Sequence, residues 1–193
     1  MEIAESLFDA IREGDLATVE KIISTDYQID VVYDRETALI VAAKCGAIEA
    51  IDLLIEKGAN LSTTVSHGYT ALIVAAEYGQ SEVVELLIEK GVDVDQTSDF
   101  GATALMWAAQ SGKAMTVELL IKKSADVDKV DENGTNAMML AAHIGNAEIV
   151  ASLIKNGADV HMANNDGDTA MMVAAEYIQD EVMELLEKEG AKC

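Results

Sequence analysis

Two sets of glycines recur along this chain at one fixed interval, and that interval limits what the chain can fold into. Successive members of each set are 33 residues apart: Gly68, Gly101, Gly134 and Gly167 form one set, and Gly46, Gly79, Gly112 and Gly145 form the other. Such a period is typical of a stack of similar units, because each unit then buries its apolar face only against its neighbours. The length of 193 residues therefore suits one linear array better than a single globular core.

The residues around these glycines repeat as well. Helix-forming segments begin with Thr37-Ala38-Leu39, Thr70-Ala71-Leu72, Thr103-Ala104-Leu105 and Thr169-Ala170-Met171, and Ala-Ala pairs stand at 42–43, 75–76, 108–109, 141–142 and 174–175. Further along, the chain has Val83-Val84-Glu85-Leu86-Leu87 and Gly157-Ala158-Asp159. These segments resemble the ankyrin-repeat family, whose unit is a β-turn followed by two antiparallel helices. The resemblance implies an all-α repeat solenoid, an ankyrin-like stack of helix-turn-helix units joined by β-turn or hairpin loops.

The repeat divides residues 1–193 into six units of one ankyrin-repeat domain. We predict an N-terminal capping unit at 1–33, full repeats at 34–66, 67–99, 100–132 and 133–165, and a C-terminal capping repeat at 166–193. Gly14 precedes Gly46 by 32 residues, one short of the period, so the first hairpin is expected to be trimmed. Capping units have outer faces that tolerate water, which favours a monomer.

The chain departs from the family pattern in two ways that run through the array. Alanine replaces the family's proline at positions 38, 71, 104, 137 and 170, and the chain contains no proline. Apolar residues replace its histidine: Ile40, Ile73, Met106, Met139 and Met172. We therefore expect apolar packing between units where the family has polar contacts. Single irregularities, expected to loosen their turns, are Arg35, Asn136 and Ser124, and Ile178 stands where other units have glycine.

The charge is strongly acidic. Thirteen Lys and Arg residues face 35 Asp and Glu residues, which gives a formal charge of −22. Direct nucleic-acid binding is disfavoured, because a phosphate backbone is bound by Lys and Arg. The charge would attract a partner with a basic surface, although it would equally serve to keep the array soluble.

The remaining composition favours a cytoplasmic, reducing location. Cys45 and Cys193 are too few and too distant in sequence for a disulfide framework. The amino terminus shows no secretory signal, and no apolar stretch is long enough to span a membrane. Export by a signal-independent route stays open.

No catalytic motif is present, so we expect a protein that is not an enzyme and needs no metal or cofactor. The acidic segment Asp126–Glu132 lacks the ligand spacing of a calcium loop and fits an acidic hairpin. His67, His143 and His161 come from different units and fit exposed turn or groove positions. Cys45 has no obvious base beside it in the sequence.

The resemblance instead implies a binding surface, because partners of ankyrin-like arrays commonly bind a concave face made of hairpin tips and first helices. Mapped onto this chain, it places Tyr69 and Phe100 at hairpin tips, and Tyr78, Trp107 and Tyr177 on first helices. Aromatic side chains are enriched at binding hot spots. The alternative is that Tyr78 and Trp107 pack neighbouring helices.

Acidic residues share the same surface. The predicted partner-binding set adds Glu77, Asp99 and Glu132 to the five aromatic residues, and Glu36, Asp131, Asp166, Asp168 and Glu176 lie nearby in the same mapping. Asp93, Asp126 and Asp159 belong to the family's turn and are expected to be structural.

Three hypotheses follow from this surface. The first is a protein–protein interaction module, an adaptor or inhibitor that binds a basic partner through the groove. The second is an acidic nucleic-acid mimic that blocks a DNA- or RNA-binding protein. The third, which the missing motifs disfavour, is an enzyme or a regulatory part of one.

Overall fold

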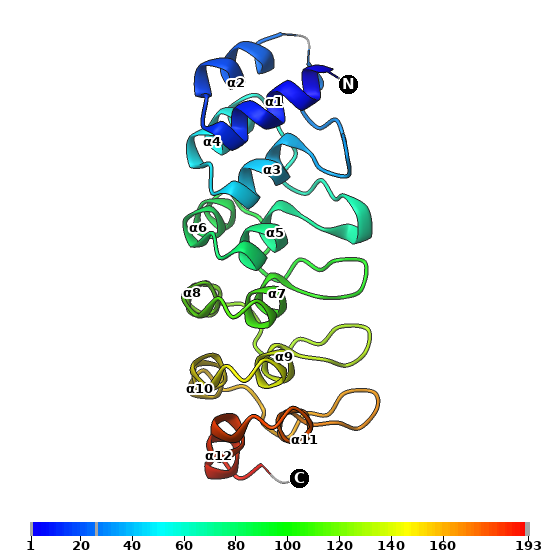
Figure 1. Ribbon diagram of the computed structural model, residues 1–193, viewed down its shortest axis with the longest axis vertical. Coiled ribbons are helices and arrows are strands. Elements are labelled where there is room, and N and C mark those ends of the chain that lie inside the picture. The colour runs from blue at the N-terminus through cyan, green and yellow to red at the C-terminus, as the bar shows by residue number, and fades with distance from the viewer. Residues whose placement is uncertain (1, 26, 192–193) are drawn as a thin grey trace.

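The computed structural model describes residues 2–25 and 27–191, and in them helices are stacked in pairs along one axis (Figure 1). The first helices of the pairs are α1 Glu2–Glu13, α3 Ala38–Cys45, α5 Ala71–Tyr78, α7 Ala104–Gln110, α9 Ala137–His143 and α11 Ala170–Glu176. The second helices are α2 Leu16–Ile23, α4 Ile48–Glu56, α6 Ser81–Glu89, α8 Ala114–Lys122, α10 Ala147–Lys155 and α12 Asp180–Lys188. A short 3-10 turn, η1 Ser66–Gly68, lies in one hairpin. The predicted all-α repeat solenoid is confirmed.

In the five units that follow the first, one polar residue sets the start of the first helix. Thr37, Thr70, Thr103 and Thr169 each accept a hydrogen bond at 3.3 Å from the backbone N–H three residues ahead. Asn136 makes the same bond at 3.0 Å, so the looser turn expected there is wrong.

Two other irregular positions also keep the geometry of the array. Ser124 has φ 70° and donates its N–H to the Ile121 carbonyl at 2.9 Å, as Gly91 does to Ile88. Ile178 adopts φ 57° in place of glycine, a costly conformation for a β-branched residue. The expectation of a looser turn at Ser124 is therefore wrong, and the backbone tolerates strain at Ile178.

The core runs continuously through the first helices. Ile40, Ile73, Met106 and Met139 are each at most 2% exposed, which agrees with the expected apolar packing. Burying each such side chain stabilises the fold by about 1.5–3 kcal/mol. The fifth member, Met172 on α11, is 39% exposed because no described helix packs beyond it.

Hairpins project from the first-helix side of the stack (Figure 1). Four hairpins share one geometry, in which the first residue donates its N–H to the carbonyl of the last at 2.9–3.0 Å: 65–69, 98–102, 131–135 and 164–168. The first hairpin, Tyr33 to Glu36, is one residue shorter and is closed by two bonds at 2.9 and 3.0 Å. Asp34 and Arg35 adopt φ 48° and 66° in it. The trimmed hairpin is confirmed, and the looser turn expected at Arg35 is wrong.

Adjacent hairpins are joined by backbone hydrogen bonds. Asp99 donates its N–H to the His67 carbonyl at 3.0 Å, and Glu132 donates to Phe100 at 3.0 Å. The contact beside Gly68 is so close that a Cβ there would lie 2.4 Å from the Asp99 nitrogen. These bonds align the hairpins in a row beside the first helices.

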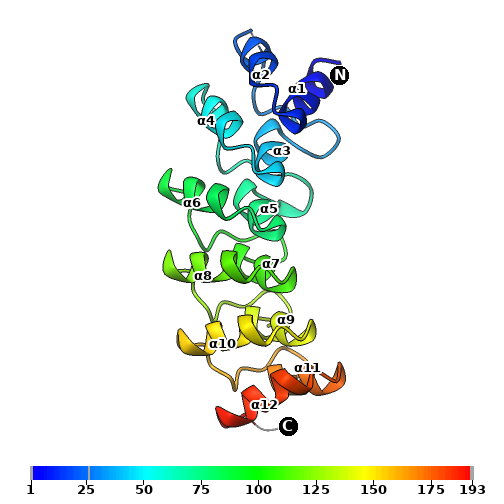
Figure 2. The ribbon, with the colours of Figure 1, turned by 60° about the vertical axis from the view of Figure 1, so that its left-hand side comes forward.

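The stack is tighter on the first-helix side than on the second-helix side. Figure 2 shows the first helices and the second helices as two neighbouring columns. Neighbouring first helices make more extensive contacts than neighbouring second helices, and crevices lie between α8 and α10 and between α10 and α12. The hairpins and the exposed side of the first helices therefore form the inner face of the array, which we call the groove face. Within the described residues, no helix has the length and apolar character needed to cross a membrane.

Candidate functional site

The groove face contains a pocket of about 600 Å³ between α3, α5 and the 65–69 hairpin, which we call the α3–α5 pocket. Its lining combines apolar, aromatic and charged side chains: Arg12, Asp34, Arg35, Glu36, Ile40, Lys44, Val65, Ser66, His67, Tyr69, Val74, Glu77 and Tyr78. Ile40 of α3 and Val74 of α5 form the floor of the pocket, and the hairpins that precede these two helices form its side. It brings together three of the predicted site residues, Tyr69, Tyr78 and Glu77.

The 65–69 hairpin also receives two aromatic side chains from the next unit. The Phe100 ring stacks on His67 with centroids 5.5 Å apart, and the Trp107 ring tilts against Tyr69 at 5.2 Å. Four of the five predicted aromatic residues thus gather around one hairpin or its pocket. His67 joins them, and its adjacency to Phe100 follows from the 33-residue offset between their positions.

One of these residues, Tyr69, is placed differently from the prediction. Tyr69 lies at the foot of its hairpin, bridged to Val65 just before α5 begins, rather than at the tip. The tip positions fall between the bridged residues, where Phe100 does lie, 49% exposed. Tyr69 is half-buried because its ring packs against Trp107.

Trp107 is more buried than a side chain that is available to contact a partner would be. Its side chain is partly buried against the core, and its indole N–H is buried without a hydrogen-bond partner among the described residues. Leaving such a group unpaired costs about 1–3 kcal/mol. Trp107 therefore supports the Tyr69 ring, in agreement with the packing alternative for this residue.

Tyr177 lies apart from the cluster. It caps the end of α11 instead of lying within it, and its ring makes an edge contact with His143 at 4.2 Å. The ring is 49% exposed. The sequence placed Tyr177 on the same face, but the structure gives it a separate neighbourhood in the last two units.

Ion pairs organise the amino-terminal wall of the pocket. Glu36 accepts from Arg12 at 3.3 Å and from Lys44 at 3.2 Å, and Arg12 also pairs with Asp9 at 3.1 Å. The Lys44 ammonium lies 5.3 Å from the centre of the Tyr78 ring. Desolvation opposes the Lys44 charge, but Glu36 and Tyr78 outweigh it and raise the Lys44 pKa. The sequence reasoning missed Arg12, which lies on α1, 24 residues from Glu36.

Glu77 is half-buried near the carboxyl end of α5. Burial raises the pKa of its carboxyl, and the Lys44 charge offsets part of that rise. Burial and the Glu77 charge in turn raise the pKa of Tyr69. Lys44, Glu77 and Tyr69 are therefore close enough to influence one another electrostatically.

The other predicted acids lie on the hairpins. Asp99 and Glu132 are exposed, while Asp131 accepts the N–H groups of Asn133 and Thr135 at 2.8 Å each. The family-turn residues Asp93, Asp126 and Asp159 each accept the N–H two residues ahead at 2.8–3.0 Å, which confirms their structural role. Over residues 2–25 and 27–191, no group of three His, Cys, Asp or Glu side chains is arranged to hold a metal ion.

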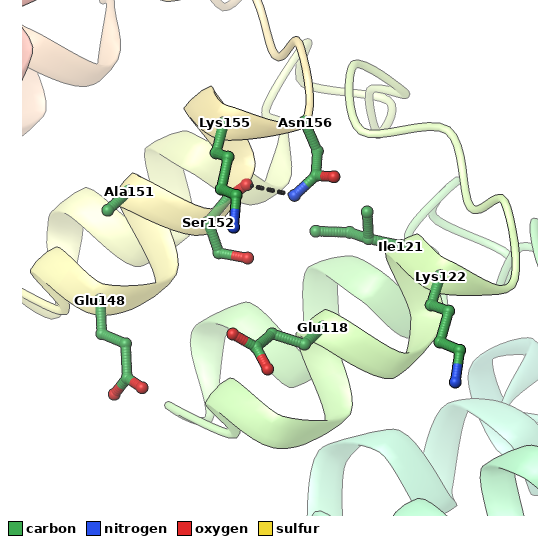
Figure 3. A pocket seen from close by; sticks show the side chains of 8 residues that line it. All are labelled: Glu118, Ile121, Lys122, Glu148, Ala151, Ser152, Lys155 and Asn156. Carbon is green, nitrogen blue, oxygen red and sulfur yellow. Dashed lines mark hydrogen bonds between the residues drawn. The ribbon is translucent and has the colours of Figure 1, made fainter.

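A second crevice, of about 550 Å³, lies between α8 and α10 on the opposite face (Figure 3). Its lining residues are Glu118, Ile121, Lys122, Glu148, Ala151, Ser152, Lys155 and Asn156. The Asn156 amide donates to the Ser152 carbonyl of its own chain segment at 2.7 Å, and the charged side chains are exposed. Because this crevice has no aromatic wall and no desolvated charged group, it is a weaker candidate for a functional site than the α3–α5 pocket.

A row of hairpins and first helices that presents one continuous face defines a repeat solenoid whose surface is suited to binding. The chain belongs to the ankyrin-repeat family: the family model described as "Ankyrin repeats (3 copies)" matches residues 7–98, 82–164 and 105–193. No curated protein matched the sequence. Ankyrin repeats are generally protein–protein interaction modules, and the family is typically non-enzymatic.

Proposed function

We propose that this protein is a non-enzymatic adaptor or inhibitor that binds a protein partner with a basic surface through its groove face. The observation that carries the proposal is the exposure of two aromatic rings on this face, Phe100 at 49% and Tyr78 at 46%. Aromatic side chains bury a large area with little loss of conformational entropy, so exposed rings on an inner face favour contact with a partner.

The surroundings of Phe100 support a basic partner. Asp99 precedes it, and the backbone of Glu132 is bonded to its carbonyl, so exposed carboxylates flank the ring. Partner Lys and Arg side chains would pair with these carboxylates at the rim, while an apolar group covers the ring. In that arrangement the charges speed association and the aromatic contact slows dissociation.

A capture experiment from cell extract tests the proposal. The wild-type protein is compared with a Tyr78→Ala/Phe100→Ala variant at low and moderate salt, and bound proteins are identified by mass spectrometry. Met115→Ala is the matched control, because Met115 is an apolar side chain, 80% exposed, on α8 of the second-helix layer. Trp107 is left intact since its ring supports Tyr69.

We expect a partner that wild type and Met115→Ala hold at both salt concentrations and that the double variant loses. Equal retention by all three proteins at both concentrations would contradict groove recognition. Basic proteins captured only at low salt, and equally by all three, would instead favour the acidic nucleic-acid mimic, whose binding depends on charge alone.

A further inference from the structure

We infer that the α3–α5 pocket receives an arginine side chain of the partner, with its guanidinium held against the Tyr69 and Tyr78 rings and paired with the Glu77 carboxylate. The inference rests on the proposed function, because it names the partner group that one part of the groove face recognises. It is carried by the Glu77 environment and by the chemistry of the pocket's aromatic walls.

Glu77 is a carboxylate whose charge is only partly compensated, by Lys44. It is half-buried in the pocket, and among the described residues it forms no ion pair within 4.0 Å. It is also the penultimate residue of α5, where the helix dipole places partial negative charge. A cation from the partner would offset the free-energy cost that burial and the helix dipole impose on the Glu77 charge.

The three cations at the pocket each have a carboxylate beside them. Arg12 is shared by Asp9 and Glu36, Lys44 is held by Glu36, and Arg35 adjoins Asp34 in the first hairpin. Asp9 does not line the pocket, so the lining holds three cations, Arg12, Arg35 and Lys44, and three carboxylates, Asp34, Glu36 and Glu77, and it carries no net charge. The three cations therefore do not make the pocket attractive to an anion.

The aromatic walls favour arginine over lysine. The Lys44 ammonium already lies 5.3 Å from the Tyr78 ring centre, which shows that this ring face accommodates a cation. A guanidinium is planar and weakly hydrated, so it can lie flat on a tyrosine ring and still direct two N–H groups to one carboxylate. With about 600 Å³ of open volume, the pocket has room for this group beside Lys44.

Small amides test the inference without the unknown partner. N-acetyl-arginine methylamide is titrated into the full-length protein and followed by NMR at the backbone amides of α5. N-acetyl-citrulline methylamide serves as the neutral probe of nearly the same shape, and N-acetyl-lysine methylamide as the compact cation. The variant is Glu77→Gln, and Glu82→Gln is its matched control, since Glu82 is an exposed acid on α6 of the same unit.

We expect saturable shifts with the arginine amide that weaken about tenfold in Glu77→Gln and stay unchanged in Glu82→Gln. The citrulline amide should bind about tenfold more weakly than the arginine amide, and the lysine amide should lie between them. Equal binding of arginine and citrulline amides, or equal effects of the two variants, would overturn the inference. If the arginine amide does not bind but capture of a partner still depends on Tyr78 and Phe100, the inference is wrong and the proposed function stands. If capture is the same for wild type and the Tyr78→Ala/Phe100→Ala variant, the proposed function itself is wrong.

Discussion

The two halves of the groove face carry different kinds of charge. In the amino-terminal half, residues 33–45 contain two cations and two carboxylates, and Arg12 reaches in from α1. In the carboxyl-terminal half, the segments 98–110, 131–143 and 164–176 contain no Lys or Arg. Their six acids are Asp99, Asp131, Glu132, Asp166, Asp168 and Glu176. The same fold thus presents an internally paired surface at one end and, within residues 2–25 and 27–191, an acidic surface without ion pairs at the other.

This difference shows that the net charge of −22 is a poor guide to any one site. The acidic half suits long-range attraction of a basic surface, which salt would weaken. The amino-terminal half, with charges of both signs, has a shaped pocket with aromatic walls and one half-buried carboxylate that is only partly compensated, which suits short-range selection of a particular side chain. A partner that contacts both halves would be attracted over long range by the acidic half and recognised by the pocket in the amino-terminal half.

The largest expected effect concerns the junction between the halves. A Cβ at Gly68 would lie 2.4 Å from the Asp99 nitrogen, and the residue has φ 73°. Gly68→Ala should therefore lower the free energy of unfolding by about 2–4 kcal/mol through combined overpacking and backbone strain. The measurement is urea unfolding followed by circular dichroism.

The matched control for that variant is Gly14→Ala. Gly14 has nearly the same φ, 72°, but a Cβ at this position would meet nothing within 4 Å beyond its chain neighbours. Strain alone should cost about 1 kcal/mol there. Equal losses in the two variants would show that contact between the 65–69 and 98–102 hairpins does not hold the two halves together.

A smaller effect should distinguish paired from unpaired acids. Glu36→Gln removes the carboxylate shared by Arg12 and Lys44, both of which are partly exposed, so we expect a loss of about 0.5–1 kcal/mol in the free energy of unfolding. Glu132→Gln in the acidic half should change it by less than about 0.5 kcal/mol. The two variants are compared by urea unfolding at low and high salt, and a loss that salt does not reduce would contradict the ion-pair explanation.

Most of the fold could be predicted from the sequence because each unit repeats the same local signals. Thr103 at the helix start and Gly79 at the helix end act through hydrogen bonds and backbone angles within a few residues. The 32-residue spacing from Gly14 to Gly46 likewise predicted the shorter first hairpin. The structures at Asn136 and Ser124 were expected to be looser, but Asn is a good cap and Ser124 still adopts a left-handed conformation.

The candidate site was less predictable because it depends on contacts between units. The repeat mapping placed Tyr78 and Phe100 on the groove face, but it could not show that Trp107 lies against Tyr69. It also gave no sign that Arg12 would reach Glu36, since the contact depends on how α1 packs against the next unit. The periodicity specifies position within a unit, whereas side-chain partners across units depend on the individual residues.

The smallest expected effect tests whether burial of the Glu77 charge destabilises the amino-terminal half of the groove face. Burial raises the pKa of Glu77 in the folded state, so the native protein holds that proton more tightly than the unfolded chain does. Stability should therefore fall as pH rises from the ordinary carboxyl range through the raised native pKa, and the penalty should persist at neutral pH. Glu77→Gln should remove this component, so the difference in unfolding free energy between variant and wild type should become more positive with rising pH.

Neighbouring groups make this prediction specific to Glu77. Lys44 and Tyr69 stay protonated throughout the acidic range because their pKa values are raised from already high ones. Glu36 is the nearby carboxyl on α3's side of the pocket, and it is stabilised by cations, so Glu36→Gln should lose stability instead of gaining it. Urea unfolding of both variants between pH 4 and 7 therefore separates the two acids by the sign of their effect. A difference curve for Glu77→Gln that is flat or falls with pH would show that Lys44 already compensates Glu77 fully, and no uncompensated part of the Glu77 charge would then remain for an arginine to neutralise.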